Sequence, residues 1–81
     1  MNHLNTKRWF VSVDIIYTVH AEEQRKERNI EKVWIEEAIV SPDYTAREGN
    51  KYLVTKKLNG HAIEVVYVKE KYLKIITVYW V

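Results

Sequence analysis

The side chains best suited to chemistry in this chain of 81 residues lie in its last third, where they alternate with apolar residues. Glu64 could accept a proton, and Lys57 could bind a phosphate. Thr55, Thr77 and Tyr79 add three hydroxyl groups. Successive side chains of a β-strand point to opposite faces, so this alternation predicts that all five share one face of a sheet. There they either converge on a substrate or form the water-facing side that any antiparallel sheet has.

The register of that sheet follows from Asn59-Gly60, a strong hairpin signal because a type I′ turn needs positive φ at both central residues. With this pair as the turn, Thr55 lies opposite Glu64. A second turn centred on residues 70–71 would place Thr77 on the other side of Glu64, and a loop two residues longer would leave the faces unchanged. The other, core face is then predicted to carry Tyr52, Val54, Ile63, Val65, Tyr67, Ile76, Val78 and Trp80.

The beginning of the chain predicts a strand and a polar helix. Alternation starts at Trp9 and predicts a half-buried strand over residues 9–17. Thr18 can cap a helix over residues 19–28, whose first turn is acidic and whose last turn is basic, the order that the helix dipole favours. Because this helix has almost no apolar residues, it should lie across the surface.

A second helix is predicted over residues 30–40, with Asn29 both ending the first helix in the left-handed region and capping the second. Ser-Pro-Asp at 41–43 ends it, because the residue before proline avoids the α region. Residues 44–50 form a polar connection that could hold a short edge strand. The core stripe of the second helix is predicted to be Ile30, Val33, Trp34, Ala38 and Ile39.

These elements predict an α+β fold with the order β-α-α-β-β-β, in which two helices cover one face of an antiparallel sheet. The first strand is expected to lie beside the last one. Residues 1–81 form one domain, of which residues 1–8 are expected to be a flexible N-terminus. The face with Glu64 then stays open.

Charge is unevenly distributed along the chain. Residues 19–46 carry a net charge of −3 and residues 47–81 a net charge of +4. The basic sheet half could attract phosphates, or its lysines could serve solubility and protect strand edges.

Several classes of site are excluded by residue types. The chain has no cysteine, only two glycines, and three histidines far apart in sequence, so we expect no disulfide, no metal site, no nucleotide-cradling loop and no cofactor. Its apolar runs are much shorter than the ~20 residues that span a bilayer, and no signal-peptide pattern opens it. We therefore expect a soluble, cytoplasmic protein.

A family resemblance extends over roughly residues 14–81. The features that carry it are His20-Ala21, Arg28 eight positions after the histidine, Ser41-Pro42-Asp43, and the segments 52–60, 65–68 and 75–79. In order and spacing they resemble the family catalogued as domain of unknown function 4258. That family in turn resembles the RelE/ParE-like and BrnT toxins of bacterial toxin–antitoxin systems, which have the fold derived above.

The resemblance implies a metal-independent ribonuclease or an inactive relative of one. Such a reaction needs a base, an acid and cations. The candidate catalytic residues are His20, Glu64 and Tyr79, and the candidate RNA-binding residues are Arg25, Arg28, Lys57, Thr55 and Thr77. The family usually has an arginine four residues after the histidine, where this chain has Gln24, with Arg25 next to it.

Each candidate also has a purely structural interpretation. Glu64 could pair with Lys57 or with neighbouring threonines, His20 could tie the first helix to the sheet, and Arg28 could neutralise helix carbonyls. The alternative function is a non-catalytic protein-interaction module with the toxin fold.

The expected partners follow from the same surfaces. The resemblance implies RNA, including RNA on the ribosome, and a cognate antitoxin, expected to be acidic and to cover the open face or a strand edge. A homodimer that buries Trp9 or Trp80 is the alternative.

Overall fold

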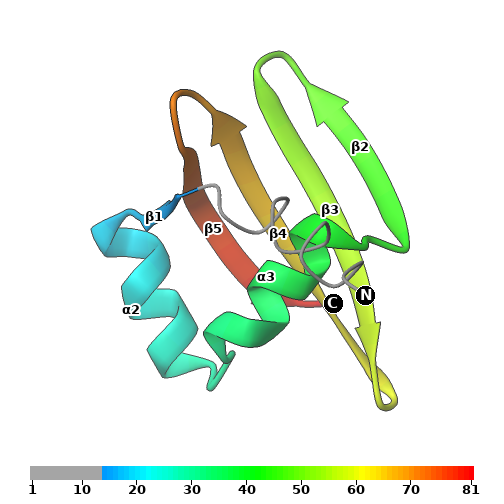
Figure 1. Ribbon diagram of the computed structural model, residues 1–81. Helices are drawn as coiled ribbons and strands as arrows, with labels where there is room; N and C mark the ends of the chain where they lie inside the picture. Colours follow the sequence, from blue (N-terminus) through cyan, green and yellow to red (C-terminus); the bar gives the residue numbers. More distant parts are fainter. Residues whose placement is uncertain (1–13) are drawn as a thin grey trace, which may run out of the picture.

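The computed structural model describes residues 14–81, which form two helices and five strands (Figure 1). In chain order these are β1 (Ile15–Tyr17), α2 (Val19–Glu27), α3 (Lys32–Val40), β2 (Tyr44–Glu48), β3 (Lys51–Leu58), β4 (His61–Lys69) and β5 (Leu73–Trp80). The predicted α+β class and element order are confirmed, and the connection at 44–50 does hold an edge strand. The flexible terminus at 1–8 and the predicted strand residues from Trp9 to Val13 lie outside the described residues.

The sheet has the strand order β1-β5-β4-β3-β2. Strands β2 to β5 pair antiparallel, whereas β1 pairs with β5 in parallel. The position of the first strand beside the last is therefore confirmed, but the sheet is mixed rather than wholly antiparallel. A parallel neighbour needs a long connection, and the two helices lie in the chain between β1 and the rest of the sheet.

The β3–β4 hairpin has the predicted register, with Thr55 opposite Glu64 and Val54 opposite Val65. Its turn differs from the prediction. Gly60 has a φ of +83°, while Asn59 is not among the described residues with positive φ. Positive φ at the second central residue alone is the pattern of a type II turn, so the type I′ prediction is wrong.

The β4–β5 pairing contains an irregularity that the sequence did not reveal. On one side of it Val66 lies opposite Thr77, and on the other Tyr67 lies opposite Ile75, so Ile76 is an extra residue in β5. Such a β-bulge moves the following residues by one position. Consequently Ile75 is fully buried in the core and Ile76 only half-buried, which makes the prediction of Ile76 as a core residue wrong.

The two helices begin and end largely for the predicted reasons. The Thr18 hydroxyl accepts a hydrogen bond from the backbone N–H of Ala21 at 3.0 Å, which caps α2. Asn29, with a φ of 55°, reverses the chain after α2. It does not cap α3, however, because α3 begins only at Lys32 and Glu31 occupies the N-cap position.

The buried stripe of α3 also differs from the prediction. Ile35 and Ala38 are fully buried, whereas Val33 is 56% exposed. Two residues of an α-helix correspond to a rotation of about 200°, so Val33 and Ile35 lie on opposite sides. With Ile35 in place of Val33, the core-facing stripe of α3 is centred closer to Ile39 than predicted.

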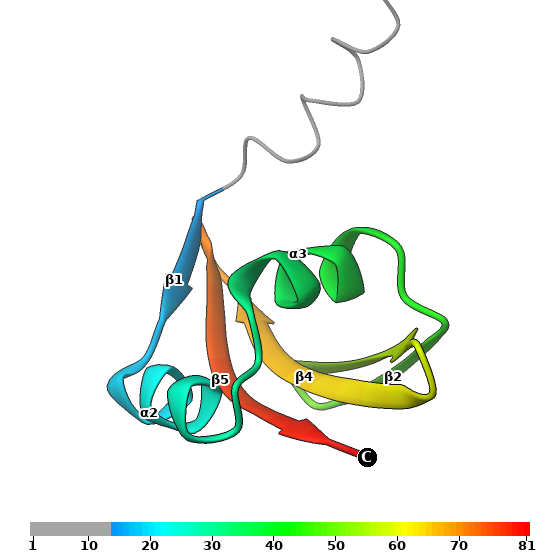
Figure 2. The same cartoon turned by 90° about the horizontal axis from the view of Figure 1, so that it is seen from below.

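The helices lie on one side of the sheet, where α3 contacts β3 and β4; Figure 2 shows α3 over the sheet and α2 beside β5 at its edge. The core between these layers contains Ala21, Ile30, Ile35, Ala38, Val54, Ile63, Val65, Tyr67, Ile75 and Val78. We call the opposite side of the sheet the open face, because no element within residues 14–81 covers it. Neither of the two described helices is long and apolar enough to cross a membrane.

Candidate functional site

Four side chains form a row across the open face, one from each of the antiparallel strands. The pairings place Tyr44 of β2 opposite Thr55, Thr55 opposite Glu64, and Glu64 opposite Tyr79. Directly opposed residues of neighbouring strands have their Cβ atoms about 4.5–5.5 Å apart. The carboxylate of Glu64 therefore lies between a threonine hydroxyl and a tyrosine hydroxyl.

The central contact of this row is a hydrogen bond from the Tyr79 hydroxyl to Oε2 of Glu64, at 2.8 Å between half-buried side chains. This bond, followed by burial and the negative charge of the carboxylate, raises the pKa of Tyr79 above its usual 10. At neutral pH the hydroxyl thus keeps its proton and holds the carboxylate in place. Within residues 14–81 the other oxygen, Oε1, has no hydrogen-bond partner.

Two further predicted residues lie diagonally to Glu64 on the same face. Lys57 is paired with Ala62 and Thr77 with Val66, each two positions from Glu64 in β4. Diagonal neighbours lie about 7–8 Å apart, within reach of a long side chain. Lys57 is exposed, and its Nζ lies 5.8 Å from the centre of the Tyr44 ring. The structure thus brings together five of the eight predicted site residues.

Helix α2 completes the edge of the sheet beyond the short strand β1. Oε1 of Gln24 accepts a hydrogen bond from the backbone N–H of Val78 at 3.1 Å. Nη1 of Arg28 donates to the carbonyl oxygen of the same residue at 3.2 Å. These two side chains satisfy backbone groups that a neighbouring strand would otherwise pair. This explains why such a polar helix packs against β5, and it places Arg28 at the sheet edge.

His20 lies on the same flank of α2 as Gln24, one helical turn earlier, and its side chain is exposed. Because Gln24 contacts the edge of β5 at Val78, His20 is near the edge of the open face. The structure does not bring His20 into contact with Glu64 or Tyr79.

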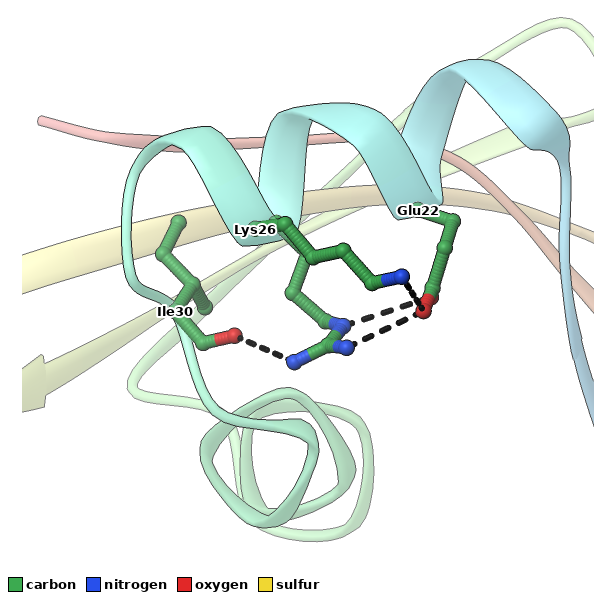
Figure 3. A network of polar contacts seen from close by, with 4 residues as sticks. Glu22, Lys26 and Ile30 are labelled. Atoms are coloured by element: carbon green, nitrogen blue, oxygen red, sulfur yellow. Dashed lines mark hydrogen bonds and ion pairs between the residues drawn. The ribbon is translucent and has the colours of Figure 1, made fainter.

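Arg25 is held between Glu22 of α2 and the backbone of Ile30, the two labelled partners of its hydrogen bonds in Figure 3. Its guanidinium group donates two hydrogen bonds to the carboxylate of Glu22, at 3.0 and 3.3 Å, and one to the carbonyl oxygen of Ile30 at 3.2 Å. Lys26 contacts the same carboxylate at 3.7 Å. The hydrogen bond from Arg25 lowers the pKa of Glu22. Arg25 therefore connects α2 to the segment that leads into α3 and is separate from the row on the open face.

Sequence reasoning missed a groove of about 380 Å³ at the end of the β3–β4 hairpin, on the side of the helices. Trp80 forms its aromatic wall, with ring centres 6.0 Å from Trp34 and 5.7 Å from His61, both edge-to-face. Glu37 of α3 and the hairpin residues 56–59 complete the lining. These residues come from three distant parts of the chain, and the unusual number of tryptophans was the one sequence signal.

No metal site is formed by the part of the chain that the structure describes, since residues 14–81 contain no group of three or more His, Asp and Glu side chains able to hold an ion.

Comparisons with known proteins gave one match. A family model described as "Domain of unknown function (DUF4258)" matches residues 17–80. The match includes both helices, strands β2 to β5 and the last residue of β1. Neither the curated proteins nor the solved structures contained a match.

Proposed function

The chain belongs to the DUF4258 family, whose description assigns no activity, and from the geometry of its open face we propose that it is a toxin-type, metal-independent endoribonuclease. The observation that carries this proposal is the hydrogen bond between Tyr79 and Glu64 at 2.8 Å, in the middle of a sheet face that also bears Lys57. A positioned carboxylate next to a cation is what abstraction of a proton beside a phosphate requires.

In the proposed reaction the 2′-hydroxyl of a ribose attacks the adjacent phosphorus atom. Glu64 takes the proton of the 2′-hydroxyl through its Oε1, while Tyr79 holds Oε2. A 2′-O–P bond forms and the P–O5′ bond breaks, so the products are a 2′,3′-cyclic phosphate and a 5′-hydroxyl. The departing 5′-oxygen receives a proton from His20, which lies exposed on the flank of α2 beside β5.

The remaining residues bind the negatively charged RNA. Lys57, diagonal to Glu64, neutralises the phosphate that is attacked, and Thr55 donates a hydrogen bond to its oxygens, while Thr77, diagonal to Glu64 on the opposite side, donates to a neighbouring part of the strand. Arg28 lies at the β5 edge, where it contacts the next phosphate along the strand. Arg25 contributes indirectly, because its contacts with Glu22 and Ile30 hold α2 in position.

Two assays test this proposal together. Expression of the wild-type protein in a bacterium should arrest growth, and Glu64→Ala or His20→Ala should relieve the arrest. The purified protein should cleave single-stranded RNA in the presence of EDTA and leave 2′,3′-cyclic phosphate ends. Harmless expression of soluble wild-type protein, together with no cleavage in vitro, would count against the ribonuclease.

The edge strand β2 supports a second candidate, a protein-interaction module. All of its residues are exposed, and its Tyr44 is 63% exposed. Such an edge can accept an added strand from a partner, the kind of contact that we propose for a cognate antitoxin. If the protein binds such a partner through β2 but cleaves no RNA, the module is the better description.

A further inference from the structure

The groove at the end of the β3–β4 hairpin has a rigid aromatic wall. Nε1 of Trp80 donates a hydrogen bond to the carbonyl oxygen of Arg28 at 2.9 Å, and the ring packs edge-to-face against Trp34. Trp80 nevertheless remains 37% exposed, and His61 beside it is exposed too. Fixed aromatic rings that stay accessible form a surface on which a planar ligand can stack.

The groove is continuous with the open face around the end of the hairpin. Lys57 and His61 line it, and both also line a second depression of about 310 Å³ with Ala62 and Val81. Ala62 is the partner of Lys57 in the hairpin, which places this depression on the open face. A single strand bound along the open face can therefore reach the groove past Lys57.

The polar side chains that line the groove differ in whether they are free to hydrogen-bond with a ligand. Lys56 is occupied, because its Nζ donates to the carbonyl oxygen of Ser41 at 2.9 Å. Glu37 presents a carboxylate to the groove from α3. An ionised carboxylate only accepts hydrogen bonds, and it can accept two in parallel.

We propose that this groove binds one unpaired guanine base of the RNA strand that occupies the open face, an inference that rests on the proposed function. The base stacks on Trp80, and its neighbouring N1–H and N2–H₂ groups donate to the two oxygens of Glu37. Adenine presents an acceptor at N1 and would face the carboxylate with a lone pair. Lys57, which neutralises the attacked phosphate, also lines the groove, so the guanine lies beside the bond that is cleaved. Cleavage is thereby directed to a fixed distance from a guanine.

Binding can be measured apart from cleavage with short single-stranded deoxyoligonucleotides, which lack the 2′-hydroxyl and cannot be cut. We would compare fluorescently labelled thymidine hexamers that carry one guanine, one adenine or one cytosine, by anisotropy at low salt. The wild-type protein should prefer the guanine hexamer by about tenfold, since a bidentate contact to a base gives roughly 5- to 150-fold discrimination. Equal affinity for all three hexamers, or no binding at all, would overturn the assignment.

Variants locate the preference in the groove. Glu37→Gln should reduce the guanine preference to about twofold or less, while Glu36→Gln, the same change on the neighbouring α3 residue, should leave it intact. Trp80→Leu should weaken binding of every hexamer by about tenfold, the effect expected for a lost stacking contact. Because Glu37 is exposed, Glu37→Gln should fold, so it still tests the base-binding groove if Trp80→Leu does not fold.

The outcome for the groove is distinguishable from that for the proposed reaction. Glu64→Gln should bind the hexamers like the wild type but fail to cleave RNA. Glu64-dependent cleavage without a guanine preference would overturn the groove assignment alone. Guanine binding without any RNA cleavage would overturn the reaction alone. A stable dimer that buries Trp80, seen by light scattering and lost in Trp80→Leu, would also refute the base-binding groove.

Discussion

Replacement of Gln24 tests whether α2 really substitutes for a neighbouring strand at the edge of β5. Val78 is fully buried, and its backbone N–H donates to Oε1 of Gln24. Gln24→Ala leaves this N–H without a partner, which costs about 1–3 kcal/mol. Alanine also favours the helix by a few tenths of a kcal/mol, which offsets a small part of the loss.

The net destabilisation should therefore be about 1–2.5 kcal/mol. For a domain of this size each kcal/mol lowers the melting temperature by about 4–8 °C, so Gln24→Ala should lower it by roughly 4–20 °C. Thermal unfolding followed by circular dichroism, with urea unfolding as a second measure, would give the value.

Two further substitutions at the same position separate the hydrogen bond from other effects. Gln24→Glu keeps an acceptor oxygen at the end of a side chain of the same length and should retain most of the stability. Gln24→Arg replaces the acceptor by a side chain that only donates hydrogen bonds, so it should be at least as destabilising as alanine. Equal losses for Gln24→Ala and Gln24→Glu would refute the strand-replacement account.

Three other predictions concern particular residues of the core and the open face. The hydroxyl of Tyr17 is buried without a hydrogen-bond partner in residues 14–81, so Tyr17→Phe should stabilise the protein by about 1 kcal/mol in urea unfolding. Tyr79→Phe should instead destabilise it by about 0.5–1.5 kcal/mol, because it removes the hydrogen bond to Glu64. In a spectrophotometric titration Tyr17 should ionise last, since burial and then the charge of Glu36 raise its pKa to about 12. Because both tyrosine pKa values are raised in the folded state, their contribution to stability is complete below pH 10 and is lost as the pH rises above it; ionisation of every tyrosine near pH 10 would contradict this. Ile75→Ala should cost about 2–5 kcal/mol and Ile76→Ala less than about 1.5 kcal/mol, and the reverse order would refute the bulge.

The hairpin register and the composition of the open face could be predicted because they depend on strict alternation. A register shift by one residue would have moved Glu64 into the core and Val65 into water, so the pattern leaves a single solution. The pairing of Thr55 with Glu64 follows directly from it. The bulge escaped prediction because Ile75 and Ile76 are chemically alike and either one fits the core.

Contacts that depend on tertiary placement could not be predicted. The polar composition of α2 indicated a surface helix, but not that Gln24 and Arg28 would pair with the backbone of Val78, which lies 54 and 50 residues later in the sequence. The partner of Glu64 was likewise assigned to lysine or threonine, whereas the structure gives Tyr79. That partner depends on the β4–β5 connection: a loop of three residues (70–72) instead of two shifts the register by one position, and the extra residue Ile76 shifts it by one more.

The groove around Trp80 escaped sequence analysis for a related reason. Its walls come from α3, from the hairpin and from the end of β5, and no local pattern connects Trp34, His61 and Trp80. Even the buried stripe of α3 was ambiguous, because Val33 and Ile35 are both apolar and only packing decides between them.

The most direct test of the central claim is the rate of RNA cleavage by Glu64→Gln, compared with that of Glu48→Gln. Glu48 lies on the same open face in the edge strand β2, so both variants remove one negative charge from that face. If Glu64 is the base, its variant should lose at least about 100-fold in kcat/KM with EDTA present, while Glu48→Gln stays within about threefold of the wild type. Equal rates for the two variants, with both folded as judged by circular dichroism, would contradict the assignment of the open face as the catalytic site.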